Sequence, residues 1–314
     1  MGRARGRGHR PSIADEVSRG VKLVVTGATG QLGTEIVNAL AGEHVDAFGR
    51  LELDLCDFVY SRSRISGLRP DVVVNAAAFT RVDDCETEPE RAFWVNTYAV
   101  RNLAQVCADI GCVLVHVSTD YVFDGMKTTP YTEDDLPNPL SVYGTSKLAG
   151  EYFVRNLVPR HYVIRTSGLY GKAGAASRRG NFVETMLRLA DEHQPIRVVE
   201  GHALTPSSAR DVARKIVDLL RTDRFGLYHV TNAGQCSWVD FARAIFALAG
   251  VTPRLEPATA TSAARARRPR YSVLAHARLA AMGADDLPSW REALAAYLRE
   301  RGRLTAPAIG RGAS

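Results

Sequence analysis

A tyrosine and a lysine four residues apart form the pair in this sequence whose types and spacing could move a proton. Tyr143 and Lys147 fall in a segment that predicts a helix, where residues i and i+4 share one face. A phenol has an unperturbed pKa of about 10, so near neutrality it needs a neighbouring cation to exchange a proton. Tyr143 is the one tyrosine of eleven with a lysine at this spacing, and only five of the forty basic residues are lysines. We therefore expect Tyr143 to transfer a proton and Lys147 to lower its pKa.

A hydrophobic run precedes this pair in the chain. Residues 113–117 predict a buried strand of a parallel sheet, because the run is short, rich in β-branched residues and almost unbroken. Catalytic groups tend to lie just past the ends of such strands. Residues 118–125 follow as a predicted loop of small hydroxyls and carboxylates, in which Thr119 is expected to share a substrate oxygen with Tyr143.

A strand, a glycine turn and a helix open the folded part of the sequence. Residues 21–25 predict the strand, Gly27, Gly30 and Gly33 mark the turn, and an apolar-periodic helix runs through residue 40. The first glycine permits a tight turn, the second lets backbone N–H groups approach a pyrophosphate, and the third allows close helix packing. This order predicts a dinucleotide-binding turn.

The end of the next strand predicts which dinucleotide binds. Residues 45–48 predict a strand that runs into Arg50, where an acid would suit the ribose 2′-OH of NAD and an arginine suits the 2′-phosphate of NADPH. Arg50 therefore favours NADPH, with an exposed turn arginine as the alternative. Asp54 and Leu55 are expected to flank the adenine. The three alanines at 76–78, after a third strand at 71–75, could form a flat surface for the cofactor or a closely packed core.

Strands and helices alternate along the chain, with a long helix expected from about residue 88 to 109. This alternation predicts an α/β fold with a doubly wound parallel sheet of the Rossmann type. We expect residues 1–20 to be a disordered basic extension and residues 21–166 an NAD(P)-binding Rossmann domain. Residues 167–300 are expected to form mainly a smaller substrate-binding lobe with segments returning to the sheet, and 301–314 a flexible tail.

Composition narrows the function classes. The net charge of +6 comes largely from the N-terminal extension and from the arginines at 265–270, so we expect no nucleic-acid partner, although that internal cluster could face an anionic substrate. No apolar run approaches the roughly 18 residues of a membrane span, and the start lacks a signal-peptide core. Five cysteines without a CxxC pair indicate reduced thiols and a cytoplasmic location, and the scattered histidines predict no protein-built metal site.

Several motifs together carry a resemblance to a known family over about residues 21–298. The broad signals are the glycine turn and the Tyr143–Lys147 pair. The narrower signals are Gly-Gln-Leu-Gly at 30–33, Asn-Ala-Ala-Ala at 75–78, Ser-Thr-Asp-Tyr-Val-Phe-Asp-Gly at 118–125 and Gly-Asn-Phe at 180–182. The chain resembles the extended short-chain dehydrogenase/reductases and, among them, the dTDP-4-dehydrorhamnose reductase family.

The resemblance implies NADPH-dependent reduction of dTDP-4-dehydro-L-rhamnose to dTDP-L-rhamnose, with NADH as a possible substitute. It places Thr119 and Asp120 against the sugar, and Lys147 on the nicotinamide ribose. Magnesium accompanies some members, but no ligand cluster is visible here, and a homodimer is left open. The residues that the resemblance places on the cofactor are Gly30, Gln31, Leu32, Asp54, Leu55, Ala77, Ala78 and Phe79.

The chain also departs from the family pattern. Gly168 stands where many members have a tryptophan that packs on the sugar, and Thr205-Pro206 stands where they read Pro-Thr. The alternatives are a nucleotide-sugar epimerase or dehydratase that retains its cofactor through the cycle, and a non-catalytic regulatory subunit of the methionine adenosyltransferase β type. Retention of Thr119, Tyr143 and Lys147 argues against the second alternative.

Overall fold

A computed structural model of the chain describes residues 20–175, 180–193, 195–258 and 265–305. Apart from Gly20, the N-terminal extension that was expected to be disordered lies outside the described residues, as does the expected tail beyond residue 305. Within the described ranges, no helix is long and apolar enough to cross a membrane.

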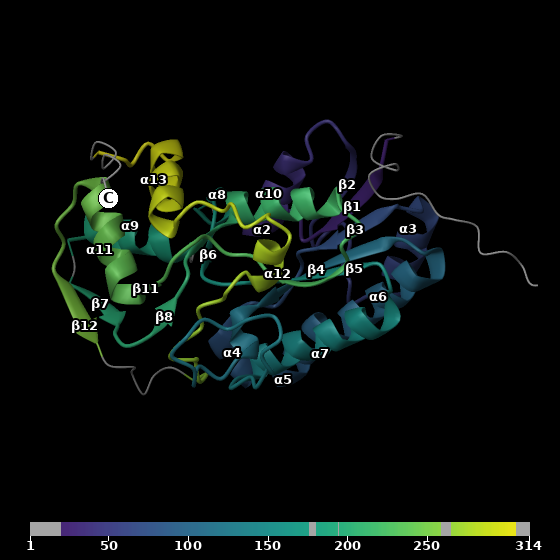
Figure 1. Ribbon diagram of the computed structural model, residues 1–314, viewed down its shortest axis with the longest axis horizontal. Helices are drawn as coiled ribbons and strands as arrows, with labels where there is room; N and C mark the ends of the chain where they lie inside the picture. The colour runs from purple at the N-terminus through teal and green to yellow at the C-terminus, as the bar shows by residue number, and fades with distance from the viewer. Residues whose placement is uncertain (1–19, 176–179, 194, 259–264, 306–314) are drawn as a thin grey trace, which may run out of the picture.

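A parallel six-stranded sheet forms the centre of the larger half (Figure 1). Chain order and sheet order differ, because the strands after β1 and β2 are added on the other side of β1. This reversal confirms the expected doubly wound α/β fold. In sheet order the strands are β2 (His44–Phe48), β1 (Lys22–Thr26), β3 (Val72–Asn75), β4 (Val113–Thr119), β5 (His161–Thr166) and β10 (Gly226–His229).

Helices cover both faces of this sheet (Figure 1). On one face, α2 (Gln31–Ala39) and α10 (Ala209–Leu220) pack on strand side chains around Ile36 and Val212. The opposite face carries α3 (Phe58–Leu68), α6 (Ala99–Ile110) and α7 (Val142–Leu157), in a core that includes Leu103 and Val154. Because both faces are buried, the inner strands β1, β3 and β4 are mostly apolar.

The long helix expected from about residue 88 to 109 is confirmed as a continuous helical run, and one π-helical turn lies in its middle. Residues 89–110 form α5 (Pro89–Phe93), a π-helical turn η1 (Trp94–Tyr98) and then α6. A shorter helix, α4 (Val82–Thr87), precedes them and ends before Pro89. A π-turn inserts one extra residue into a helix and is frequent at functional sites. Here it contains the fully buried Asn96.

The strand that precedes the polar segment is longer than predicted. It continues to Thr119, and residues 120–122 form a single 3₁₀ turn, η2 (Asp120–Val122). The strand therefore ends two residues later than predicted, and Ser118 and Thr119 belong to the strand and not to the loop. The ladder with β5 extends to Thr119↔Thr166, which accounts for the extension.

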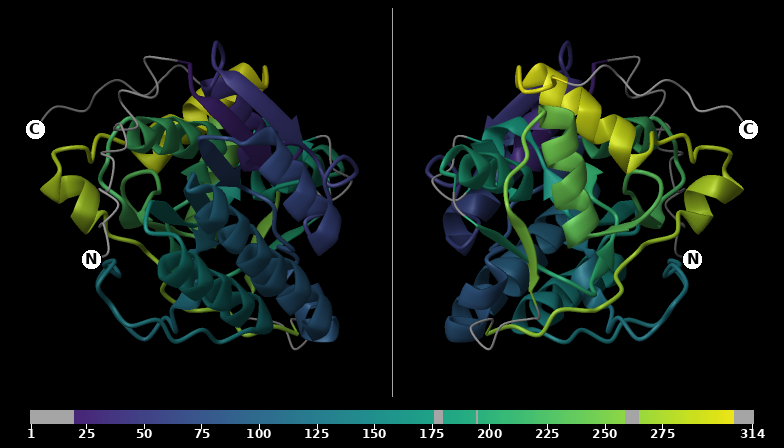
Figure 2. Two further views of the ribbon diagram at one scale, coloured as in Figure 1. Left: turned by 90° about the vertical axis from the view of Figure 1, so that its right-hand side faces the viewer. Right: turned by 90° about the vertical axis from the view of Figure 1, so that its left-hand side faces the viewer.

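The second half of the chain builds a smaller body beside the sheet. Figure 2 shows α11 and α13 side by side on this end of the molecule. Its core is aromatic, with Tyr170, Phe241, Trp290 and Tyr297 in contact. Its elements include α8 (Lys172–Ala175), α9 (Phe182–Asp191), α11 (Trp238–Ala249) and α13 (Trp290–Glu300). The short helix α12 (Ala277–Ala281) instead packs against β10 of the large sheet. The small strand pairs are β6 (Leu169–Tyr170) with β9 (Ser207–Ser208), β7 (Ile196–Val199) with β12 (Leu255–Ala258), and β8 (Ala203–Leu204) with β11 (Cys236–Ser237).

Candidate active site

The glycine turn lies at the point where the strand order reverses, between β1 and β3. Gly27 has φ 71°, and a Cβ there would lie 2.6 Å from the Ala77 backbone nitrogen. A Cβ on Gly33 would lie 2.1 Å from the Gly27 carbonyl oxygen. Both positions therefore need glycine, one for the turn and one for the close approach of α2. The N-terminus of α2 faces the space above the sheet, where it can bind phosphate groups.

That space is a cavity of about 1290 Å³ between the sheet and the smaller body. Eight of the predicted site residues line it, and they come from the glycine turn and the start of α2, the segment after β3, and β4, η2 and α7. They are Gly30, Gln31, Leu32, Ala78, Thr119, Asp120, Tyr143 and Lys147. The structure therefore brings the predicted dinucleotide turn and the predicted proton-transfer pair to one cavity.

The other predicted cofactor residues do not line that cavity. Arg50 is exposed beyond β2, and its Nε lies 3.4 Å from Asp54 Oδ2. Leu55 is buried in the core under α3. Ala77 packs against Gly27, and Phe79 packs against Tyr143.

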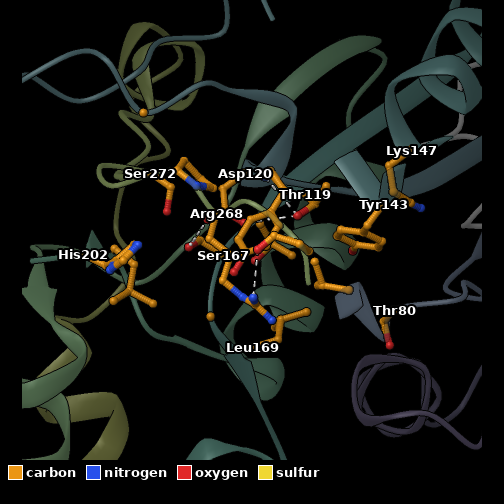
Figure 3. Close-up of a pocket in the computed structure, with 18 of the residues that line it drawn as sticks. Thr80, Thr119, Asp120, Tyr143, Lys147, Ser167, Leu169, His202, Arg268 and Ser272 are labelled. Carbon is orange, nitrogen blue, oxygen red and sulfur yellow. Dashed lines mark hydrogen bonds between the residues drawn. The ribbon is translucent and has the colours of Figure 1, made fainter. Parts of the chain in front are cut away.

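Tyr143 stands in the first turn of α7 with its ring buried against Phe79 and Cys85. Its edge contacts Tyr121, with ring centroids 5.9 Å apart. Burial raises the pKa of the phenol, a hydrogen bond with Thr119 lowers it, and the charge of Asp120 raises it further. In the view of Figure 3, Tyr143 lies between Thr119 and Lys147.

Lys147 is almost fully buried one turn further along α7. Its Nζ donates to the Val117 carbonyl oxygen at 2.7 Å. Burial lowers the pKa of Lys147 to about 8, and the charge of Glu151 partly opposes this. Glu151 is itself paired with buried Arg165, at 2.9 Å and 2.7 Å. The effect of Lys147 on the pKa of Tyr143 stays a prediction.

A buried ladder of polar side chains connects the glycine turn to Lys147. Thr26, Asn75 and His116 are neighbours in the register of β1, β3 and β4. Asn75 Oδ1 accepts from the Thr26 hydroxyl at 2.9 Å and from the Ala77 N–H at 3.1 Å, so its amide nitrogen faces His116 Nδ1 at 3.1 Å. Burial and the charge of Lys147 lower the pKa of His116 well below its usual value, so the ring is neutral.

The direction of these bonds fixes the proton on His116. Because the Asn75 amide donates to Nδ1, the neutral ring carries its proton on Nε2, which lies 3.5 Å from Lys147 Nζ. An N–H there cannot accept from an ammonium. His116 therefore accepts no hydrogen bond from Lys147, whose ammonium donates to the Val117 carbonyl oxygen and can donate to a ligand in the cavity.

The sequence analysis assigned no role to Asn96, a polar residue within the helix predicted at about 88–109. Its side chain accepts from the Phe79 N–H at 2.8 Å and donates to the Phe79 carbonyl at 3.0 Å. It also donates to the Ser146 hydroxyl at 3.1 Å, next to Lys147. Asn96 therefore ties the predicted cofactor segment to the helix that carries Tyr143. A polar residue inside an apolar helical stripe was the signal in the sequence.

The arginine cluster at 265–270 lines the far side of the cavity, and one of its members is already paired. Arg268 forms two bonds with Asp83, at 2.7 Å and 3.2 Å, and the Ala266 N–H donates to the same carboxylate at 3.0 Å. The segment is thereby fastened to α4 beside the cavity. Arg267 and Arg270 also line the cavity.

Gly168 has φ 54°, and a Cβ there would lie 2.8 Å from Leu204 Cδ1 and 3.2 Å from Pro206 Cα. Leu204 and Pro206 therefore occupy the space toward which a side chain at 168 would point. Leu204 also lines the cavity, together with Phe182 and Trp238. These three residues contribute apolar surface to the wall of the cavity.

Among the residues that the structure describes, no group of three or more histidine, cysteine or carboxylate side chains could hold a metal ion.

The fold and the cavity together define a reductase of the extended short-chain dehydrogenase/reductase type. Within this class, the chain belongs to the family whose sequence model is described as the RmlD substrate binding domain, which matches residues 21–302.

Relatives agree with this assignment along nearly the whole chain. The dTDP-4-dehydrorhamnose reductase of Streptomyces griseus is 42% identical over 283 residues, covering 87% of this chain and 91% of that protein. The dTDP-4-keto-6-deoxy-D-glucose reductase of Streptomyces niveus is 39% identical over 278 residues, covering 87% and 95%. The structure of dTDP-4-dehydrorhamnose reductase from Bacillus anthracis in complex with NADP has a TM-score of 0.86 at 36% identity, covering 90% and 99%.

Proposed function

We propose that this protein reduces the 4-keto group of dTDP-4-dehydro-L-rhamnose to dTDP-L-rhamnose with NADPH. The observation that carries the proposal is the shared cavity, into which the glycine turn, Thr119, Tyr143 and Lys147 all open. The Streptomyces griseus relative supports the substrate, and the Bacillus anthracis structure supports the cofactor.

The residues around the glycine turn fit a dinucleotide. A Cβ on Gly27 or Gly33 would collide with backbone atoms, and Gly30, Gln31 and Leu32 between them line the cavity at the N-terminus of α2. Gly30, Gln31 and Leu32 would hold the pyrophosphate, and Arg50, with Asp54 beside it, would meet the 2′-phosphate. Ala78 would lie against the cofactor and Lys147 would bind the nicotinamide ribose.

Reduced nicotinamide supplies a hydride for the carbonyl carbon of the sugar. Tyr143 gives its proton to the carbonyl oxygen. The carbonyl carbon thus gains two electrons with the hydride, the oxygen gains the proton, and an alcohol forms. The phenolate then recovers a proton from water. Lys147 stabilises the phenolate by its charge, Thr119 lies beside the phenol, and Asp120 faces the sugar.

The test is oxidation of NADPH, followed by its absorbance, with dTDP-4-dehydro-L-rhamnose and with purified protein. Turnover that disappears in Tyr143→Phe supports the proposal. Lack of turnover by the wild type, or equal turnover by this variant, would refute it. Tightly held NAD without consumption of reductant would instead favour an epimerase.

A second candidate substrate is dTDP-4-keto-6-deoxy-D-glucose. The Streptomyces niveus relative, a dTDP-4-keto-6-deoxy-D-glucose reductase, favours it. Both keto sugars would meet the same proton donor. The ratio of kcat/KM values for the two sugars decides between them.

A further inference from the structure

Lys147 is almost fully buried, yet the protein bonds only part of its ammonium. Among the residues that the structure describes, the Val117 carbonyl is the one oxygen that accepts from Nζ, at 2.7 Å. An ammonium has three protons to donate. The other polar atom near Nζ is Nε2 of His116, at 3.5 Å. What this ring nitrogen presents to the amine therefore decides where the remaining protons of Lys147 can go.

A backbone donor determines the direction of the polar ladder behind His116. The Ala77 N–H can only donate, and it donates to Asn75 Oδ1 at 3.1 Å, so the amide nitrogen of Asn75 points to His116 Nδ1 at 3.1 Å. A ring protonated on both nitrogens would set two donors against each other there. His116 is fully buried, so no bulk water can offset that cost. The ladder therefore holds His116 neutral, with its one N–H against Lys147.

This N–H acts differently on the two forms of Lys147. Against the ammonium it is a donor that faces a donor, so the protons not bonded to Val117 turn to the cavity that Lys147 lines. A neutral amine has a lone pair, which can accept from the N–H of His116. The ring therefore favours the neutral amine. Burial acts in the same direction and lowers the pKa of Lys147 to about 8.

The titratable groups around Lys147, within the described part of the chain, come from α7, β5 and β4. Tyr143 and Glu151 lie one turn to either side on α7. Arg165 of β5 pairs with Glu151 at 2.9 Å and 2.7 Å, and His116 comes from β4. Burial raises the pKa of Tyr143, so the phenol is neutral near pH 8. Groups on η2 and α4 face the phenol of Tyr143 instead, and they are Asp120, Tyr121 and Cys85. His116 is thus the uncharged neighbour whose hydrogen-bond direction can alter the charge of Lys147.

We propose that Asn75 and His116 are positioning residues for Lys147, because they hold an N–H against its amine. This N–H directs the free ammonium protons into the cavity, and it bonds the amine once Lys147 has lost a proton. The ladder thereby sets the alkaline limit of the charge that supports proton transfer by Tyr143. The catalytic meaning of this inference rests on the proposed function, whereas the protonation states themselves require no substrate.

Nuclear magnetic resonance of ¹⁵N-labelled histidine tests the direction of the ladder in the full chain without added ligand. His116 is the signal, among those of eight histidines, that is lost in His116→Gln. We expect the proton on Nε2 and a ring that stays neutral from about pH 5 to about pH 9, across the ordinary range of histidine. In Asn75→Asp the new carboxylate should accept from the ring and place a proton on Nδ1. A proton on Nδ1 in the wild type, or titration of the ring in this range, would overturn the proposal.

The ¹⁵N signal of the lysine side chains reports the charge of Lys147, which is the one signal of five lost in Lys147→Arg. Its midpoint should rise by about one pH unit in His116→Gln, because a glutamine amide can turn its oxygen to the ammonium, and such a bond favours the charged form. Asn75→Asp should raise it too, since His116 Nε2 becomes an acceptor. A rise in Asn75→Asp alone would come from the added charge and would overturn the proposal. Unchanged midpoints in both folded variants would do the same.

His229→Gln is the matched control. His229 is equally buried, but its Nδ1 lies 3.1 Å and 3.0 Å from the carbonyl oxygens of Tyr131 and Ala275. The midpoint of Lys147 should keep its wild-type value in this variant, and an equal rise would overturn the proposal.

The kinetic readout separates this inference from the proposed function. Where the wild type reduces the keto sugar, the alkaline limb of kcat/KM should move upward in His116→Gln together with the midpoint of Lys147. A limb that stays in place while the midpoint moves would overturn the catalytic role of the ladder. Lack of turnover by the wild type would refute the proposed function alone, and both titrations would still report on His116 and Lys147.

Discussion

Asn96 and Phe79 exchange two hydrogen bonds, one in each direction, between the side chain of the first and the backbone of the second. The π-turn is what brings this amide into place, and its third bond reaches Ser146 on α7. Replacement by alanine would leave the buried N–H and C=O of Phe79 without these partners.

Asn96→Ala should therefore lower the free energy of unfolding by about 2–4 kcal/mol, because an unsatisfied buried polar group costs roughly 1–3 kcal/mol. Urea denaturation measures this value. Arg101→Ala, an exposed position on the following helix, is the control and should change stability by less than about 0.5 kcal/mol. Equal stability of the two variants would contradict the structural role of Asn96.

Tyr143→Phe should reduce kcat by about 10²- to 10⁴-fold, which is the usual contribution of a positioned proton donor. The binding of NADPH should stay within a few-fold of the wild type, since the ring remains in its pocket. Fluorescence titration with NADPH separates the two effects. Tyr152→Phe, on the exposed side of the same helix, should retain full activity.

Arg50→Ala tests the cofactor preference. Loss of a charge-assisted bond of about 1.5–3 kcal/mol should raise the Kd for NADPH by roughly 10- to 100-fold and leave the Kd for NADH unchanged. Arg62→Ala removes another exposed arginine that is paired with an acid, Asp109, and should affect neither cofactor. An equal increase in the Kd values for NADPH and NADH in Arg50→Ala would show that Arg50 does not bind the 2′-phosphate.

Asp120→Asn should stabilise the fold at pH 7.5. Burial raises the pKa of Asp120 from 3.8 to about 6. Between these two values the folded state holds more protons than the unfolded state, so the free energy of unfolding falls as pH rises through this window, and the cost is complete above about pH 6. Removing the charge should add on the order of 3 kcal/mol at pH 7.5 and roughly half as much at pH 5, where the unfolded carboxyl is already mostly ionised. Thermal unfolding at both pH values measures the difference, and an equal gain at each would contradict this assignment.

Gly168→Ala should destabilise the protein by about 1–3 kcal/mol, because the backbone has a positive φ and the new Cβ would meet Leu204. Adding Leu204→Ala should recover only the part that comes from the contact. A double-mutant cycle measures this coupling. Full recovery in the double variant would show that the backbone conformation costs nothing.

The features that were predicted from the sequence are those that depend on the spacing of nearby residues. The alternation of strands and helices, the glycine turn and the shared face of Tyr143 and Lys147 all follow from spacings of a few residues. The parallel sheet followed from this alternation, and the family motifs predicted the eight residues that line one side of the cavity.

The features that the sequence did not predict depend on contacts between distant residues. Asn96 is satisfied by a residue 17 positions away, Ser167 reaches Asp120 across 47 positions, and Arg268 reaches Asp83 across 185. The pairing of β7 with β12 likewise joins segments that lie far apart in the chain. Helix α3 was not predicted, because its apolar residues form only a weak amphipathic pattern. Such contacts leave no periodic trace in the chain, so only the folded arrangement reveals them.

The last strand of the sheet has a consequence for dissecting this protein. Because β10 comes from the second half of the chain and pairs with β5, a fragment ending at residue 166 would carry a bare apolar edge. Such a fragment should self-associate when expressed alone, and mixing it with its missing half should restore a monodisperse particle. The two halves of the chain can therefore be described separately, but they are expected to fold only as one unit.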